Sequence, residues 1–191
     1  MSWLKLWQRR TSDAGAADAL PVHRIGPLPI APARGRIIVA EHVLDATVVA
    51  LMAFAGEDGP HEGIVCWAGR VIGADTLVAS AVVPRASHGP QGVRVTEANY
   101  GDAARAARSI GLGLVAQVHS HPGADTRHSS GDDTMILMPR EGMFSIVVGN
   151  YGRGSLRLGE GLGVHQLQDG QWVQVEPASG VVIVIPSLLI A

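Results

Sequence analysis

The chain has 191 residues, of which 47% are hydrophobic, so it is long enough for one domain with a buried core and is not globally disordered. Its 15 Lys and Arg against 17 Asp and Glu give a formal net charge of −2, which disfavours nucleic acid or an anionic membrane as the main partner. With Cys66 as its single cysteine, the chain cannot form an internal disulfide or a cysteine-based metal cluster, so any metal site must rest on His, Asp and Glu.

We do not expect the first residues to be a secretory signal. Residues 1–10 place their charge after the apolar residues, the reverse of a secretory signal, and no apolar run approaches the ~20 residues that span a bilayer. We therefore expect a cytoplasmic protein without a membrane span. Residues 1–35 are predicted to be a flexible arm, because 11–35 are rich in Ala, Pro and Gly without periodicity. Residues 3–7 could instead form a short apolar helix that touches a partner or a membrane.

Regular structure is predicted from residue 36 onward, with periodicity and turn residues as the guides. The expected elements are, in order, strand 37–40, helix 41–55, turn 57–60, a hairpin of strands 63–72 and 76–83, loop 84–93, helix 97–110, strand 114–118, polar segment 119–133, short helix 133–138, strand 143–148 and two strands within 155–175. Together these elements indicate an α/β fold, with a mixed, mostly antiparallel sheet flanked by two or three helices. Residues 36–176 form the predicted folded domain, and the apolar residues 177–191 form an edge strand or a tail that docks on the body or binds another protein.

One polar stretch after a buried strand carries the chemistry. His119 and His121 lie two residues apart, and in an extended segment such residues point to the same side, so both imidazoles can converge. Pro122 favours a turn, and Asp132 lies where the next helix starts, within reach of the two rings. Two imidazoles and one carboxylate leave a fourth tetrahedral position for water, which is typical of a catalytic zinc rather than a structural one. Such a zinc lowers the pKa of water towards ~7.

Other residues in this region have structural as well as catalytic interpretations. Ser129 can donate a hydrogen bond to a developing oxyanion, but Ser129 and Asp132 also match a helix N-cap followed by an acid in the first turn. His128 falls outside the ligand pattern, and we expect it to be a solvated loop residue. Cys66 lies within a hydrophobic strand and is expected in the core rather than as a nucleophile.

The motif His119-x-His121-Pro122, six residues, then Ser129-x-x-Asp132 resembles the JAMM metalloprotease motif of the MPN-domain family at every fixed position and spacing. The order of helix, hairpin, helix and strand before the motif also fits, over residues 36–175. The resemblance implies an MPN-like (cytidine-deaminase-like) fold, and one zinc per chain held by the two histidines and the aspartate. It further implies that Ser129 stabilises the tetrahedral intermediate.

The resemblance also implies a glutamate that opens the first hairpin strand and acts as general acid and base. Glu62 matches this position because it directly precedes an apolar strand, and Glu57, five residues earlier in the turn, is the alternative. One departure stands out: the family often has two residues between this glutamate and a glycine, whereas here Gly63 follows at once.

Members of this family hydrolyse peptide or isopeptide bonds after the C-terminal glycine of ubiquitin or ubiquitin-like proteins. The resemblance thus implies a bacterial Jab-type, deubiquitinase-like peptidase that deconjugates or processes a ubiquitin-like protein. Activating- and conjugating-type enzymes of the same modification or antiviral defence pathway are the expected further partners. Three alternatives stay open: a peptidase that trims a sulfur-carrier protein, a DNA-repair-associated relative, which the charge balance disfavours, and a non-catalytic MPN scaffold.

Overall fold

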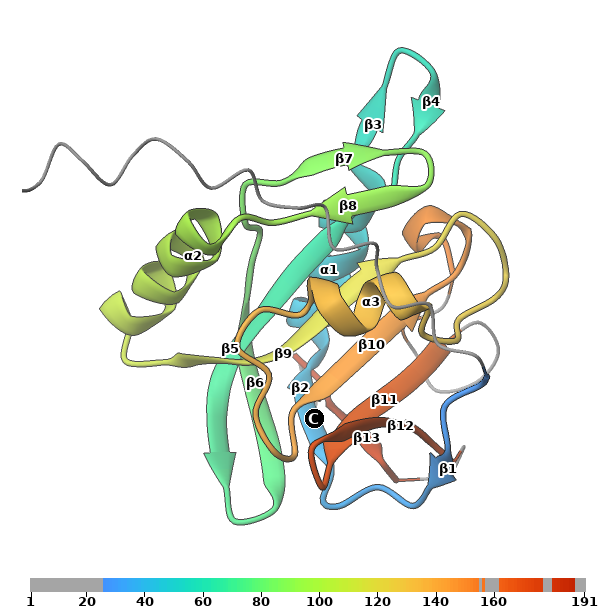
Figure 1. Cartoon of the computed structure of the whole chain (residues 1–191). Coiled ribbons are helices and arrows are strands. Elements are labelled where there is room, and N and C mark those ends of the chain that lie inside the picture. The colour runs from blue at the N-terminus through green and yellow to red at the C-terminus, as the bar shows by residue number, and fades with distance from the viewer. Residues whose placement is uncertain (1–25, 155, 157–161, 177–179, 188–191) are drawn as a thin grey trace, which may run out of the picture.

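The computed structural model describes residues 26–154, 156, 162–176 and 180–187 (Figure 1). The short apolar helix considered for residues 3–7 lies outside the described residues. Within them the elements are β1 (Ile30–Ala31), β2 (Ile37–Ala40), α1 (Glu41–Met52), β3 (Ala55–Gly56), β4 (Gly59–Pro60), β5 (Ile64–Ile72), β6 (Asp75–Val82), β7 (Ser87–Gly89), β8 (Gly92–Arg94), α2 (Glu97–Ser109), β9 (Gly113–Ser120), α3 (Ser130–Met135), β10 (Phe144–Val148), η2 (Asn150–Gly152), β11 (Leu162–Gln168), β12 (Gln171–Val175) and β13 (Val182–Ile185).

Nine of these described strands form one curled, mixed sheet in the order β1-β12-β11-β10-β9-β5-β6-β2-β13. Its two longest ladders, which join β5 to β6 and β5 to β9, are antiparallel, whereas β9 and β10 run parallel. Strands β3 and β4, and strands β7 and β8, form two small antiparallel hairpins beside the sheet (Figure 1). The predicted α/β fold, with a mixed, mostly antiparallel sheet and two or three helices, is confirmed, and the described residues contain three α-helices.

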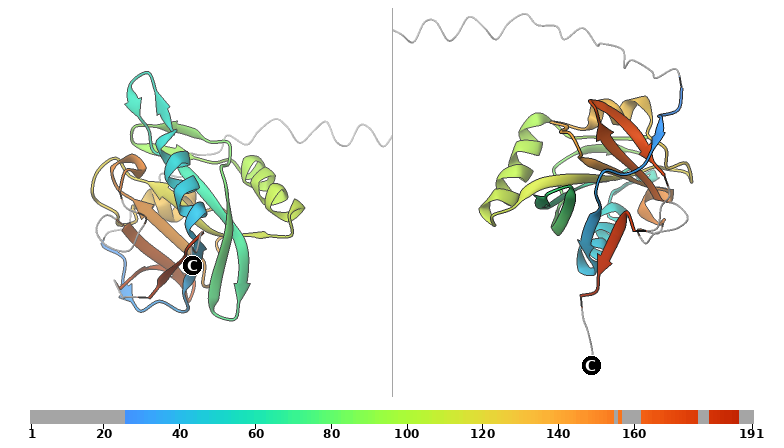
Figure 2. Two further views of the ribbon diagram at one scale, coloured as in Figure 1. Left: turned by 180° about the vertical axis from the view of Figure 1, so that it is seen from behind. Right: turned by 90° about the horizontal axis from the view of Figure 1, so that it is seen from below.

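The helices cover both faces of the sheet. Helix α1 lies on one face, and α2 and α3 lie on the other (Figure 2). Because both faces are covered, the first six residues of β5 are all buried, as in a strand at the centre of a layered fold. The core on the α1 side contains Leu51 and Trp67, and the Trp67 indole donates to Thr47 Oγ1 of α1 at 2.9 Å.

The register between β5 and β9 positions the functional region. Ile64 of β5 lies opposite His119 of β9, so the residues just before β5 lie beside the end of β9. Both ladders of β5 shift register beside Ala68, at the middle of the strand. The end of β5 that faces the functional region is therefore paired without interruption.

Several predicted boundaries are wrong in detail. The short helix spans 130–135 rather than 133–138, because Ser129 caps it three residues earlier and the chain is extended again at Ile136. Helix α1 ends at Met52 rather than at residue 55. The expected loop 84–93 contains β7 and the start of β8, and the expected turn at 57–60 is part of the β3–β4 hairpin.

Residues at both ends of the described chain lie against the sheet. Strand β1, within the segment expected to be an arm, pairs in parallel with β12, and Arg34 forms an ion pair with Asp169. Strand β13 pairs in parallel with β2 at the opposite edge of the sheet. In the part of the chain that the structure describes, we find no helix of the length and apolar character that crossing a membrane requires.

Candidate metal centre

The side chains of the two histidines of the motif project from the same face of the sheet. His119 lies in β9 and is completely buried, and His121 follows directly after the end of that strand. His121 N donates to Val148 O of β10 at 2.9 Å, so the strand pairing continues beyond β9. The alternation of side chains therefore holds for both residues, as the sequence predicts.

Asp132 is placed by the N-terminus of α3. Ser129 caps this helix: its Oγ accepts from Asp132 N at 3.2 Å, and its own N donates to Asp132 Oδ2 at 2.6 Å. This reciprocal capping box fixes the carboxylate on the side of α3 that faces β9. The structural interpretation of Ser129 and Asp132 as a helix cap therefore holds together with their proximity to the histidines.

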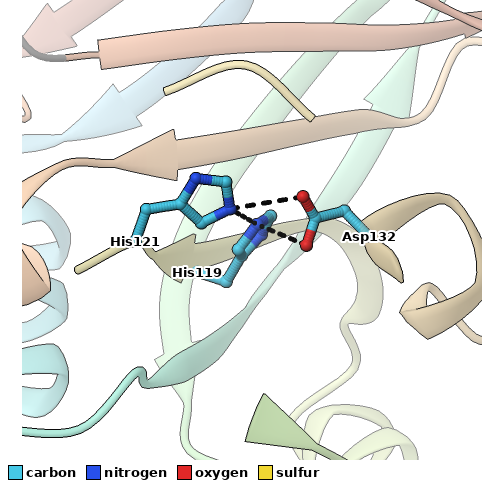
Figure 3. Close-up of side chains that lie close together, drawn as sticks. All are labelled: His119, His121 and Asp132. Carbon is cyan, nitrogen blue, oxygen red and sulfur yellow. Dashed lines mark hydrogen bonds and ion pairs between the residues drawn. The ribbon is translucent and has the colours of Figure 1, made fainter. Parts of the chain in front are cut away.

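The three side chains converge and form the ligand triangle, in which each histidine lies beside a different oxygen of the Asp132 carboxylate (Figure 3). His119 Nε2 lies 3.2 Å from His121 Nε2 and 3.2 Å from Asp132 Oδ1, and His121 Nε2 lies 3.2 Å from Asp132 Oδ2. A tetrahedral metal with bonds of 2.0–2.1 Å places its ligand atoms about 3.3 Å apart. The donor atoms therefore fit a single metal ion, and imidazole with carboxylate suits zinc or a similar transition metal.

The electrostatics of the triangle suit a cation. Burial opposes ionisation of Asp132, but hydrogen bonds from His119 and His121 outweigh burial and hold the pKa of Asp132 well below its usual range. Burial lowers the pKa of His119, so this imidazole favours its neutral form. Burial also disfavours protonated His121, but Asp132, Asp125 and Glu62 more than offset it and raise the pKa of His121. A metal ion would replace the proton that these groups compete for.

Glu62 faces the same hollow as the triangle. A cavity of about 700 Å³ is lined by Glu62, His121, Ser129 and Asp132, together with residues of β8 and α3. Burial raises the pKa of Glu62 to about 7, against a lowering by His121 and with a further rise from Asp132. Glu57 is exposed in the turn between β3 and β4 and does not line this cavity. The structure thus brings Glu62, rather than Glu57, together with the candidate ligands.

The expectation that His128 is a solvated loop residue is wrong. Its ring is buried and stacks on His165 with centroids 4.0 Å apart, and its Nε2 lies 2.8 Å from Ser145 Oγ of β10. Burial, reinforced by His128 and His119, lowers the pKa of His165 to about 2. His128 therefore anchors the loop before α3 to the sheet. Residues 119–133 show no periodicity, so no signal in the sequence distinguished this inward position from the exposed ones.

Cys66 behaves as the sequence predicts. It is buried in β5, and burial raises the pKa of its thiol to about 12. A thiol so far from ionisation at neutral pH is a core residue and not a nucleophile.

Comparison with known proteins defines the family. The model of the prokaryotic homologs of the JAB domain, Prok-JAB, matches residues 45–159, which is more than half of the chain. The chain belongs to the Prok-JAB family. The resemblance to JAMM proteins of the MPN-domain class is therefore confirmed, and the matched residues include Glu62 and the whole ligand triangle.

Individual proteins are similar to this Prok-JAB chain in sequence or in fold. The chain is 34% identical over 114 residues to the probable metalloprotease y4jG of Sinorhizobium fredii, an alignment that covers 56% of this chain and 68% of the relative. A solution structure from Desulfitobacterium hafniense has a TM-score of 0.61 at 15% identity, covering 80% of this chain and 94% of its own. One from Salinibacter ruber has a TM-score of 0.52 at 24% identity, covering 78% and 91%. The two structures show the shared fold.

Proposed function

We propose that this Prok-JAB protein is a zinc-dependent hydrolase that cleaves peptide or isopeptide bonds after the C-terminal glycine of a ubiquitin-like protein in the cytoplasm. The observation that carries the proposal is the triangle of His119, His121 and Asp132, with Glu62 in the same cavity. A non-catalytic scaffold would not require three side chains whose donor atoms are close enough to bind one metal ion. Nor would it require the Glu62 carboxylate beside them.

The residues have distinct roles in this proposal. His119, His121 and Asp132 would hold one zinc ion, which when bound supplies an electrophile that acidifies water and polarises a carbonyl. Glu62 accepts a proton from the attacking water and delivers it to the departing amine, for which a pKa near neutrality is suited. The Ser129 hydroxyl, which can donate as well as accept, donates to the developing oxyanion.

The surface around the triangle suits an extended substrate. The cavity of about 700 Å³ has Glu62 and strand β8 as one wall, and Gly92 and Gly131 are among the residues that line it. A narrow Gly-Gly terminus can lie along such a strand with main-chain hydrogen bonds. A second cavity of about 510 Å³ shares His121 and Ser129 with the first and extends towards β12. Hollows on both sides of the triangle support a substrate that continues beyond the cleaved bond.

The identity of the ubiquitin-like substrate separates two versions of this function. Deconjugation would place the protein beside activating- and conjugating-type enzymes of the same modification or defence pathway. Trimming of a sulfur-carrier protein uses the same residues and the same bond chemistry. The second cavity favours deconjugation, because a large leaving group needs room that a short trimmed peptide does not.

The first experiment measures metal content by elemental analysis of wild type and of the His119→Ala, His121→Ala double variant. We expect one zinc per chain in wild type and none in the variant. Cleavage is then followed by mass spectrometry on ubiquitin-like proteins ending in Gly-Gly, joined to a reporter protein or to the Nζ of a peptide lysine. Glu62→Ala should keep the metal and lose cleavage, and Glu57→Ala should keep both. Wild type that takes up no metal when zinc is offered would overturn the proposal.

A further inference from the structure

Three side chains next to Glu62 form a hydrogen-bonded chain that the proposed reaction does not use. Asp58 Oδ1 lies 2.6 Å from His61 Nε2, and His61 Nδ1 lies 2.7 Å from His88 Nδ1. His61 is buried and directly precedes Glu62 in the sequence. Asp58 lies in the turn between β3 and β4 and His88 lies in β7, so the chain joins the two small hairpins, which lie side by side in Figure 1.

For neutral imidazoles, the two contacts assign a position to each hydrogen. An ionised carboxylate only accepts, so His61 Nε2 donates to Asp58, whose pKa is lowered chiefly by this hydrogen bond. A neutral imidazole that donates from Nε2 has a lone pair on Nδ1, so His61 Nδ1 accepts from His88 Nδ1. Each ring is thereby assigned one tautomer, and the chain runs from His88 through His61 to Asp58.

Two glycines make room for this arrangement. A Cβ atom at Gly56 would come within 2.4 Å of the His61 ring, and one at Gly63 within 2.5 Å of the Phe54 ring. Phe54 in turn meets the His88 ring edge-on, with centroids 5.1 Å apart. The glycine directly after the glutamate, which departs from the family's usual spacing, is therefore required by the packing around this chain of hydrogen bonds.

The same region holds the backbone of Glu62. Glu62 N donates to Gly89 O at 2.9 Å, one residue beyond His88, so residues 61 and 62 are each tied to the β7–β8 hairpin. On the other side, Gly63 N donates to Ser120 Oγ of β9 at 2.9 Å. Glu62 thus lies between one link to the hairpin and one link to the strand that carries His119.

We propose that Asp58, His61 and His88 are positioning residues, which hold Glu62 and the β8 wall of the cavity in place beside the candidate metal ligands. The structural part of the proposal stands on the contacts above, and only its catalytic consequence rests on the proposed function. A held carboxylate favours proton transfer because little motion is needed to reach the reacting geometry.

The test compares two replacements of His88, which lies at an exposed position of its hairpin. Asparagine places an N–H donor the same number of bonds from the backbone as imidazole Nδ1, so His88→Asn can still donate to His61. His88→Leu cannot donate. The matched control is His42→Leu, the same replacement at an exposed histidine of α1.

Backbone amide exchange and histidine nitrogen spectra provide readouts that need no substrate. In His88→Leu, we expect the Glu62 amide to exchange about tenfold faster or more, while the Gly63 amide, which is bonded to β9, and those within β5 do not change. His88→Asn and His42→Leu should resemble wild type. Nitrogen-15 spectra should show His61 protonated at Nε2 and His88 at Nδ1. Unchanged exchange of Glu62 in His88→Leu, equal exchange in both His88 variants, or His61 protonated at Nδ1 would each overturn the proposal.

The catalytic consequence is measured separately with the Gly-Gly conjugates. We expect His88→Leu to lower kcat about tenfold at unchanged zinc content, and His88→Asn to lower it less than about threefold. A kcat that is the same in both variants would overturn the catalytic part. If no conjugate is cleaved by wild type, the proposed function fails, whereas the exchange and nitrogen spectra still decide whether Glu62 is held.

Discussion

Replacing Glu62 by glutamine removes one titratable group from the wall of the cavity while keeping its size. Burial raises the pKa of Glu62 from 4.5 to about 7, so the folded protein binds this proton more tightly than the unfolded chain does. The stability that this proton contributes is therefore present at acidic pH and is lost as the pH rises from about 4.5 through about 7. Glutamine does not titrate, so the variant should gain stability relative to wild type as the pH rises.

The size of the effect follows from the shift and from the exposure of the side chain. Without screening by solvent, a rise from 4.5 to about 7 corresponds to about 3 kcal/mol of unfolding free energy. Glu62 is only half-buried, and water screens part of this, so we expect about 1.5 kcal/mol between pH 5 and pH 8. Bound zinc should reduce the effect, because a nearby cation favours the ionised carboxylate.

The assay is urea unfolding at pH 5, 6, 7 and 8 on metal-free protein prepared with a chelator. The measured quantity is the unfolding free energy of Glu62→Gln minus that of wild type, in which most other titrations cancel. Glu57→Gln, at an exposed position of the β3–β4 turn, is the matched control for the substitution itself. A Glu62→Gln difference that is flat or falls with pH would refute the placement of Glu62 in a desolvated site.

Three further predictions follow from the packing and the ligand geometry. Leu51→Ala, at a fully buried position of α1, should lower the unfolding free energy by about 2–5 kcal/mol in urea titrations; a loss below about 1 kcal/mol would contradict the described core. Gly163→Ala places a Cβ 1.9 Å from Thr126 O, so it should displace the loop before α3. We expect zinc binding, measured in competition with a chelator, to weaken about tenfold or more, and an unchanged affinity would contradict this contact. Asp132→Asn should lower zinc affinity by a hundredfold or so in the same competition, because a neutral amide replaces the anionic ligand; equal affinity would remove Asp132 from the ligand set.

The ligand triangle could be predicted because its geometry is local. Two histidines separated by one residue at a strand end must share a face, and Ser129 brings Asp132 towards them through a cap that the sequence signals. Adjacency to a strand favoured Glu62 over Glu57, and the register of β5 against β9 places it in the cavity.

Other features depend on contacts between distant segments and carry no local signal. His128 is buried because Ser145 and His165, from two later strands, surround its ring, and neither strand could be aligned with the loop from the sequence. The sequence of the β7–β8 hairpin is too short and too polar to be distinguished from a loop. The hairpin is held next to the site by the hydrogen bond from Glu62 N to Gly89 O. The chain of Asp58, His61 and His88 joins two such hairpins and was missed for the same reason.

The irregularity near the middle of β5 has a practical consequence for anyone modifying this protein. Both ladders of β5 shift register near Ala68, which lies between the β5–β6 tip at Gly73 and the end of β5 at Ile64. A structural change introduced at Gly73 can therefore be absorbed at the register shifts before it reaches Ile64 and Glu62. The half of β5 next to the functional region is paired regularly on both sides, and the register shifts separate that half from the tip. The exposed tip at Gly73 is accordingly the place to insert a label or an affinity tag while keeping the reactive end in alignment.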